Sequence, residues 1–214
     1  KNLTDFFKRS GILILAAVLA AGTSLTRLKT TSDYGKESTR GKSELTSNID
    51  NKTQGLDKDY ATQWSYGIAE SMTLLIPNFY GGSSSSSVLS LEDSKTLDFL
   101  KKFKNKKLAN SLAQYKSSSY WGDQPIVSGP TYAGAIVIFL FILGLLFVKS
   151  ELRIWLLLAT IMSLMLAWGK NFMPLTNFFL DFFPGYNKFR AVSMILIIAE
   201  FTIPLLAFIA LDKF

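Results

Sequence analysis

Hydrophobic residues are concentrated in a few long runs along the 214-residue chain, and polar residues fill the stretches between them. Three runs, 131–148, 154–168 and 191–211, are almost entirely apolar. A bilayer's hydrocarbon core is about 30 Å thick and is crossed by about 20 apolar helical residues, because unpaired backbone amides are costly in lipid. We therefore predict three transmembrane helices, the first two joined by the charged turn 149–153.

A fourth apolar run, residues 11–25, is short and rich in Ala and Gly, and it follows Lys8 and Arg9. A basic start followed by a short apolar run with small residues is typical of a secretory signal peptide. Small residues are equally typical of a helix that packs tightly in a membrane bundle, and Leu3 and Phe6 extend the apolar stretch upstream. We expect a membrane span here, with a signal peptide as the alternative.

The long stretch 29–130, between the apolar runs 11–25 and 131–148, has the composition of a polar domain. Residues 60–76 have a helical pattern that ends at Pro77, and a second helix is expected from Ser90 to Tyr115, after a linker rich in Gly and Ser. The predicted fold class is mainly α: a polytopic helical membrane protein with about four transmembrane helices and a large, mostly helical extracytoplasmic insertion. The predicted parts are the N-terminal flank and first span (1–28), the external domain (29–130), and three further spans (131–214) with an interfacial loop (169–190).

The orientation follows from the basic residues in the short flanks of the spans, which favour the cytoplasmic side. The basic residues placed inside are Lys1, Lys8, Arg9, Lys149, Arg153 and Lys213, and those in the competing short loop are Lys170, Lys188 and Arg190. The excess on the first side predicts that residues 29–130 lie on the outer side of a bacterial cytoplasmic (inner) membrane.

Composition narrows the possible chemistry. The chain has no Cys and no His, which removes disulfides, thiol catalysis and the commonest general base and metal ligand. The net charge of +7 suits contact with anionic lipid or with phosphate, and no nucleic-acid-binding motif accompanies it. No cofactor is evident and no metal site is predicted, although carboxylates leave a divalent metal open. The first residue is Lys1, so we expect a longer chain or a processed one.

Glu200 is an ionisable residue in the middle of the last apolar run. A charged group at that depth costs a few kcal/mol, so it usually faces the interior of a helix bundle or a polar cavity. Pro204 lacks an N–H group and so frees the carbonyl of Glu200. Two interpretations stay open: a contact to a ligand, proton or ion, and a structural glutamate that holds helices together.

The loop 169–190 is aromatic and amphipathic. Its apolar residues recur at helical spacing, which predicts a short helix at the membrane interface. Lys188 and Arg190 follow a Pro-Gly turn and precede the last span, and Lys170 lies at the other end of the loop. Cations beside a helix N-terminus favour a phosphate or diphosphate ligand, while snorkelling anchors at the membrane surface are the alternative.

Aromatic side chains near polar groups suggest a possible sugar-binding surface. Trp121 and Asp123 lie just ahead of the second span, and Trp64 and Tyr66 lie in the external domain. Aromatic rings stack on sugars, and carboxylates accept hydrogen bonds from them. Trp and Tyr are also common at any membrane interface, so interfacial anchoring is the alternative.

Six strings of this sequence carry a family resemblance. They are STRGKSEL (38–45), GLDKDYATQWSYG (55–67), LLIPNFYGG (74–82), YWGDQPIV (120–127), WGKNFMPLTNFF (168–179) and PGYNKFRAVS (184–193). They resemble the Bacteroidetes branch of the YfhO family, which comprises large bacterial membrane proteins, much longer than this chain. The resemblance runs through nearly the whole sequence.

The YfhO family is thought to resemble GT-C glycosyltransferases. The resemblance therefore implies transfer of a sugar from a polyprenyl-phosphate carrier to a cell-envelope glycan acceptor, with the rest of a longer chain as a partner. In GT-C enzymes the catalytic carboxylate lies in the first external loop, which is expected upstream of this sequence, so no catalytic residue is assigned. The alternatives are a transporter or flippase-like protein, in which Glu200 couples transport, and a non-catalytic scaffold of an envelope complex.

Overall fold

The computed structural model describes residues 3–42, 48–84, 102, 105–108, 111 and 119–213, and within these ranges it is helical and has no strand. The longer helices are α1 (Leu3–Thr23), α2 (Leu25–Lys36), α6 (Ala135–Phe147), α7 (Glu151–Ala167), α8 (Met173–Phe182) and α9 (Leu196–Leu211). The short ones are α3 (Lys58–Ala61) and the 3-10 turns η1 (Ile49–Asn51), η2 (Ala69–Leu74), η3 (Gly169–Phe172), η4 (Tyr186–Lys188) and η5 (Val192–Ile195). The helix expected from Ser90 to Tyr115 lies mostly outside the described residues.

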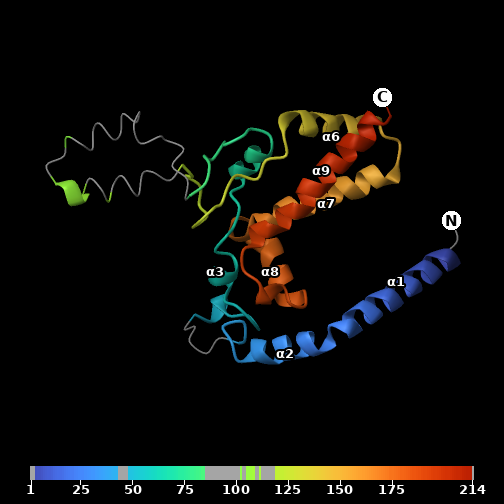
Figure 1. Cartoon of the computed structure of the whole chain (residues 1–214), viewed down its shortest axis with the longest axis horizontal. Coiled ribbons are helices and arrows are strands. Elements are labelled where there is room, and N and C mark those ends of the chain that lie inside the picture. Colours follow the sequence, from blue (N-terminus) through green and yellow to red (C-terminus); the bar gives the residue numbers. More distant parts are fainter. Residues whose placement is uncertain are drawn as a thin grey trace.

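Helices α6, α7 and α9 pack side by side into a bundle (Figure 1). Their shared core is apolar and includes Phe141, Leu156 and Leu206. Gly144 lets α6 approach α9 closely, because a Cβ atom there would lie 2.9 Å from the side chain of Leu206. The two α7–α9 hydroxyls Thr160 and Thr202 are 2.7 Å apart in a buried hydrogen bond, which satisfies polar groups within the helix contact.

Among the residues that it describes, the structure confirms helices that are long and apolar enough to cross a membrane, but fewer than the four expected. Two helical stretches qualify, Leu3–Thr23 and Val192–Leu211, and a third qualifies if α7 and the helical stretch after it count as one bent span. The expected span 131–148 contains only the 13-residue helix α6, which is about 20 Å long. Residues 131–134 are not helical, because the N–H groups of Ala133 and Gly134 both bond to the carbonyl of Leu74.

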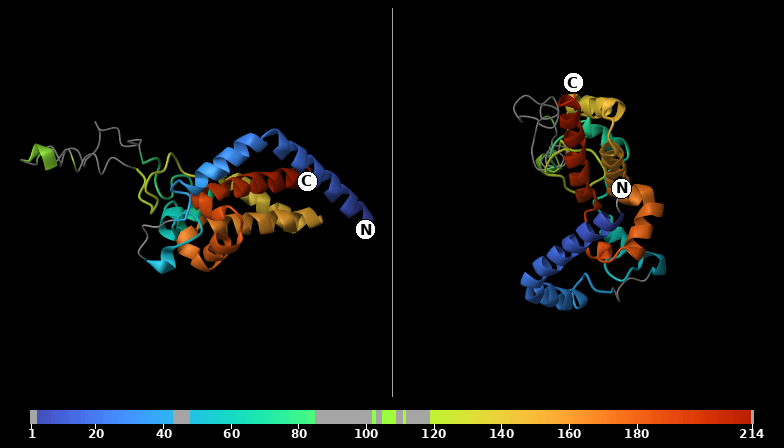
Figure 2. Two further views of the ribbon diagram at one scale, coloured as in Figure 1. Left: turned by 90° about the horizontal axis from the view of Figure 1, so that it is seen from below. Right: turned by 90° about the vertical axis from the view of Figure 1, so that its right-hand side faces the viewer.

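Helix α1 stands apart from the bundle. Together with α2 it forms an arm that extends away from the other helices (Figures 1 and 2). It has no buried residue, and its glycines Gly11 and Gly22 have no atom within 4 Å of an added Cβ. Sequence alone left the stretch 11–25 open between a span and a signal peptide. Most of this stretch belongs to α1, a 21-residue apolar helix that ends at Thr23.

The polar segment 58–74 lies against the end of the bundle where α7 ends and the connection to α9 begins. A single helix was expected over 60–76, and this prediction is wrong: α3 ends at Ala61 and η2 begins at Ala69. Between them the chain forms turns and irregular structure and bonds elsewhere, with the N–H of Tyr66 donating to the carbonyl of Ala167 and the N–H of Ser193 donating to that of Trp64. These contacts replace the helical hydrogen bonds and fix the segment beside the bend between α7 and α8.

Helix α8 turns sharply away from α7. The bend between the two helical stretches is 111°, at a break where Gly169 has φ +48. If α7 crosses a membrane, α8 therefore runs nearly along the membrane surface. Thr176 and Leu180 face the protein, whereas Phe178 and Phe182 are 56% and 73% exposed. This arrangement fits the interfacial helix expected in the loop 169–190.

Candidate anion-binding site beside the membrane interface

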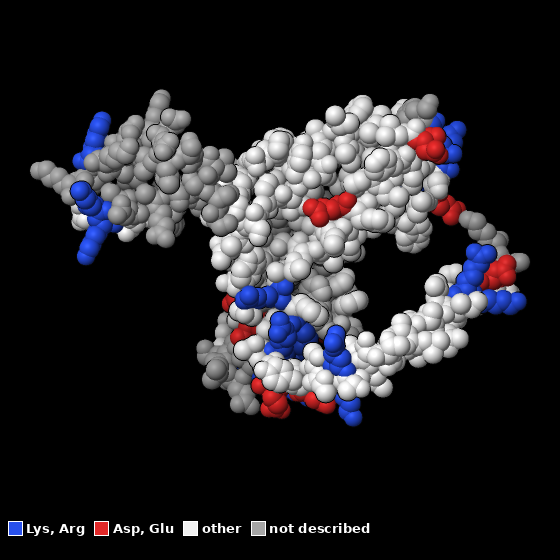
Figure 3. Space-filling model, viewed as in Figure 1, with Lys and Arg blue, Asp and Glu red and all other residues white. Residues whose placement is uncertain are grey.

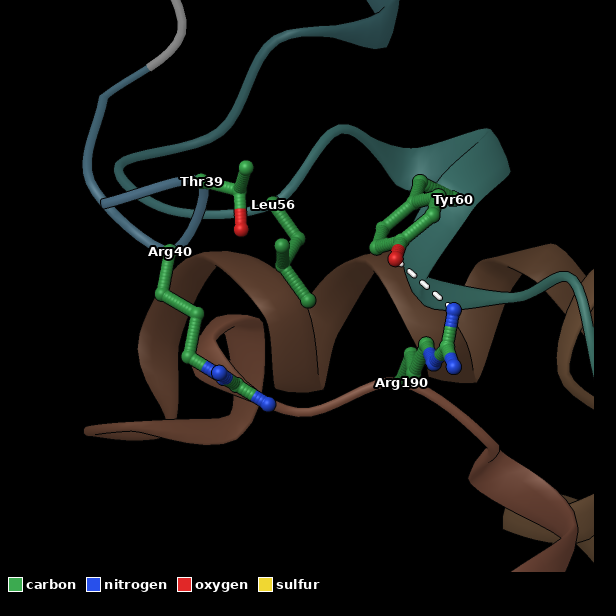
Figure 4. Close-up of a pocket in the computed structure, with 5 residues that line it drawn as sticks. All are labelled: Thr39, Arg40, Leu56, Tyr60 and Arg190. Carbon is green, nitrogen blue, oxygen red and sulfur yellow. Dashed lines mark hydrogen bonds between the residues drawn. The ribbon is translucent and has the colours of Figure 1, made fainter. Parts of the chain in front are cut away.

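A polar pocket of about 150 Å³ forms where three distant stretches of the chain meet (Figure 4). Its lining residues are Thr39, Arg40, Leu56, Tyr60 and Arg190. Arg40 comes from the loop after α2, Tyr60 from α3, and Arg190 from the strand-like connection ahead of η5. Two arginines thus contribute to the lining of one small pocket, and their positive charges favour an anion.

The side chains of Arg40 and Lys188 each donate a hydrogen bond to the backbone carbonyl of the other residue. The Arg40 Nε donates to the carbonyl of Lys188 at 2.9 Å, and the Lys188 Nζ donates to the carbonyls of Arg40 at 2.8 Å and Gln54 at 2.6 Å. The ammonium group of Lys188 therefore binds backbone carbonyls of the protein itself. It positions the loop that carries Arg40, whereas sequence alone predicted it as a direct phosphate contact.

Arg190 is held by aromatic side chains of the 58–74 segment. Its Nη1 donates to the Tyr60 hydroxyl at 2.7 Å, and its guanidinium carbon lies 4.7 Å from the ring centre of Trp64 and 5.4 Å from that of Tyr60. Trp64 is fixed in turn, since its Nε1 donates to the carbonyl of Ile126. A guanidinium has five N–H donors, so the bond to Tyr60 leaves donors available to a ligand.

A second, apolar pocket of about 130 Å³ shares Arg190 with the polar pocket. Its other lining residues are Tyr186, Phe189, Ala191, Val192 and Ile195. Ala191 has φ +67, a left-handed conformation that a non-glycine residue rarely adopts and that costs about 1–2 kcal/mol. Strained residues cluster at functional sites, and this one directly follows Arg190 at the junction of the two pockets.

The remaining predicted site residues do not join this pocket. Lys170 is exposed and does not line it, and its backbone N–H is bonded to the hydroxyl of Ser65. Tyr66 is 2% exposed and packs between Ala167 and Leu196, so it offers no ring to a sugar. Of the four proposed sugar contacts, only Trp64 lies beside Arg190.

Trp121 and Asp123 lie on a different surface. Trp121 is 67% exposed and stacks on Tyr80, with ring centres 4.7 Å apart and an interplanar angle of 14°. Asp123 is exposed nearby in sequence. Sequence reasoning grouped these two with Trp64 and Tyr66, but the structure brings together Trp121 with Tyr80 and Trp64 with Arg190.

A buried carboxylate, Glu70, was missed by sequence reasoning. It is 4% exposed, its Oε1 accepts from the Tyr120 hydroxyl at 3.0 Å and from the Gln124 amide at 3.1 Å, and its Oε2 accepts from the N–H of Gly67 at 3.0 Å. Burial, joined by the nearby Glu70 charge, raises the pKa of Tyr66 and of Tyr120 well above the usual tyrosine range. No periodicity or spacing signals this cluster, because Tyr120 and Gln124 lie 50 and 54 residues from Glu70 in the sequence.

Glu200 lies on the exposed side of α9, whereas we expected it to face the interior of the bundle. The buried side of the helix carries Ala199, Ile203 and Leu206. The space-filling view shows mainly uncharged surface over the bundle, with basic side chains gathered near α2, α3 and α8 (Figure 3). The carboxylate of Glu200 is therefore exposed near the middle of a candidate span, and, besides burial, its charge is one of the causes that raise the pKa of Tyr66.

Comparison with known proteins gives no relative. No protein-family model, no curated protein and no solved structure matches the chain. Among the described residues, no group of three or more carboxylates is placed to hold a metal ion. The site is therefore interpreted from its own geometry and from the resemblance of the six sequence strings.

Proposed function

We propose that this chain is part of a polytopic bacterial membrane protein that binds a polyprenyl-phosphate-linked sugar and takes part in its transfer to a cell-envelope acceptor. The resemblance to the YfhO family and, through it, to GT-C glycosyltransferases supplies the reaction class. The observation that carries the proposal is the position of Arg190, which lines a polar pocket on one side and an apolar pocket on the other.

This geometry matches a ligand with an anionic group attached to a hydrocarbon chain. Arg40 and Arg190 supply charged donors to a phosphate, and charge-assisted bonds of this kind are shorter and about twice as strong as neutral ones. Phe189, Val192 and Ile195 supply an apolar surface directly beside them. Tyr60 and Trp64 hold the Arg190 guanidinium in place, so little side-chain entropy is lost when an anion binds.

The arrangement supports binding and positioning, and assigns no catalytic base. Glu70 is the buried carboxylate nearest in sequence to the pocket residue Tyr60, but both of its oxygens already accept hydrogen bonds from the protein. We therefore propose Arg40 and Arg190 as phosphate ligands, Tyr60 and Trp64 as supports for Arg190, and Lys188 as the residue that positions Arg40.

Ligand binding in lipid nanodiscs tests this proposal. Arg190→Gln should weaken binding of a polyprenyl phosphate by about 1.5–3 kcal/mol, or roughly 10- to 100-fold in Kd. Binding of the uncharged polyprenol should stay unchanged. Lys170→Gln removes the same charge from an exposed residue outside the pocket and serves as the control. Equal affinities of wild type and Arg190→Gln for the phosphate would refute the site, and equal losses for both lipids would make Arg190 an interfacial anchor.

The proposed outer location of the site needs its own test. The chain has no cysteine, so a single introduced cysteine reports on one side of the membrane. Gly129→Cys, in open space, should react with a membrane-impermeant maleimide in intact spheroplasts. Ser150→Cys, at the start of α7, should react only after the cells are opened. The reverse pattern would place the pocket in the cytoplasm and rule out the proposed substrate.

A further inference from the structure

Glu200 gives the outward face of α9 a chemical requirement that the described helices do not meet. Val192–Leu211 is the most apolar candidate span, and Glu200 lies near its middle. The residues around Glu200 on that face, among them Ile197, Phe201 and Phe208, are 65% or more exposed. A carboxylate facing lipid at this depth costs about 2.5–3.5 kcal/mol on insertion scales, and ionisable groups in spans almost always face protein or water.

The face presents hydrogen-bond acceptors without donors. Besides the carboxylate, the backbone carbonyl of Glu200 lacks its usual helical partner, since Pro204 is inside the helix and has no N–H. The neighbouring side chains Ile197, Phe201 and Phe208 are hydrocarbon. Two acceptors therefore lie together at mid-membrane depth, and a complementary surface must supply donors or a positive charge.

The other described apolar helices do not supply such a donor. Residues 11–22 of α1 and 135–147 of α6 contain no side-chain donor at all. In α7 the hydroxyls of Thr160 and Ser163 are bonded to Thr202 and to the carbonyl of Ile195, on the side of α9 opposite to Glu200. The other donors of α7, Arg153 and Trp155, lie in its first five residues, and Arg153 donates to the carbonyl of Leu145. A second copy of α9 would bring a second Glu200, and two carboxyl groups can hydrogen-bond to each other only when at least one of them is protonated.

We propose that the Glu200 face of α9 is the docking surface for a further membrane-spanning helix, which presents Lys, Arg, Asn or Gln to Glu200 near the bilayer midplane. The partner is thus defined by charge complementarity: a cationic or amide donor in an otherwise apolar helix. This inference is independent of the phosphate pocket, whose residues lie on the connection before η5 and on the external segments.

Oxygen accessibility of nitroxide labels tests whether protein covers this face. Single cysteines are introduced at Ile197 and Phe201 on the Glu200 face, and at Ile136 and Phe139 on the exposed side of α6 as controls. The tagged protein is isolated in membrane discs cut from the producing cells without detergent, so that neighbouring helices stay in place. Labels at 197 and 201 should be severalfold less accessible to oxygen than those at 136 and 139. Equal accessibility at the four positions would overturn the proposal.

Variants of Glu200 identify what covers the face. Glu200→Leu should raise the oxygen accessibility at position 201 to the control value, because the donor helix loses its acceptor, and Glu200→Gln should keep most of the shielding. Shielding that is unaffected by Glu200→Leu would show ordinary apolar packing and refute the donor helix. Spin–spin coupling between two labels at position 201 would mean that a second copy covers the face, which also refutes the proposed partner.

Discussion

Two polar clusters flank the 58–74 segment, and they are built in opposite ways. Around Arg190 the charged group is exposed, has one hydrogen bond to Tyr60 and opens into a cavity. Around Glu70 the charged group is 4% exposed and both carboxylate oxygens accept bonds from the protein. Arg190 therefore has N–H donors available to a ligand, whereas neither oxygen of the buried Glu70 carboxylate is available to one. Charge alone therefore does not mark a binding site; unused bonding capacity beside a cavity does.

The comparison is tested most strongly by removing Glu70. Glu70→Ala leaves the Tyr120 hydroxyl, the Gln124 amide and the Gly67 N–H without their acceptor. An unsatisfied buried polar group costs about 1–3 kcal/mol, so we expect a loss of several kcal/mol in thermal unfolding experiments in nanodiscs. Glu70→Gln, which keeps one acceptor oxygen, is the matched control and should lose less. A Glu70→Ala protein within about 0.5 kcal/mol of wild type would show that the cluster is not structural.

Alkaline pH should destabilise the buried cluster around Glu70. Burial raises the pKa of Tyr66 and Tyr120 in the folded protein, whereas the unfolded chain ionises near pH 10. Their contribution to stability is therefore fully present below about pH 10 and is lost as the pH rises toward the folded-state pKa values. Thermal unfolding from pH 8 to 11 measures this loss.

Tyr66→Phe should reduce that alkaline loss, because Phe has no group to ionise. Tyr34→Phe removes an exposed tyrosine of α2 and is the control. If both variants retain the wild-type dependence on pH, the buried phenols do not determine alkaline stability.

The apolar runs predicted most of the longer helices, because a run of apolar residues long enough to cross a bilayer can be recognised from the local sequence alone. The ends of those helices depended on distant partners. Residues 131–134 are not helical because the N–H groups of Ala133 and Gly134 bond to Leu74, and no local pattern encodes that contact. The segment 60–76 failed as one helix for the same reason, since its central backbone bonds to Ala167 and Ser193.

The candidate site was predictable only in part. The Pro-Gly turn and the helix that follows identified Arg190 from sequence, and the same argument assigned Lys188 and Lys170 as ligands. Arg40 lies 150 residues before Arg190 in the sequence, and no local pattern connects the two. Lys188 bonds to two backbone carbonyls, so its role depends on loop contacts that its charge does not reveal.

Removing the ammonium group of Lys188 should have a smaller effect on stability than removing Glu70. Lys188→Met removes its bonds to the carbonyls of Arg40 and Gln54, and we expect a stability loss of about 1 kcal/mol. Phosphate-lipid affinity should fall in the wild-type background but not in an Arg40→Gln background, because Lys188 acts through Arg40. An equal fall in both backgrounds would make Lys188 a direct ligand, since independent effects add.

The smallest effect on stability is expected at Ala191. Its left-handed backbone, with φ +67, is strained by about 1–2 kcal/mol for a residue with a Cβ. Ala191→Gly relieves that strain but increases the entropy of the unfolded chain by about 0.4–1 kcal/mol, so thermal unfolding should change by about 1 kcal/mol or less. The measurable change is in affinity, because a glycine directly after Arg190 loosens the connection that orients its guanidinium. Ala191→Val, with a β-branched side chain in the same conformation, should lose stability instead. Wild-type phosphate-lipid binding by Ala191→Gly would show that this strain does not help to orient Arg190.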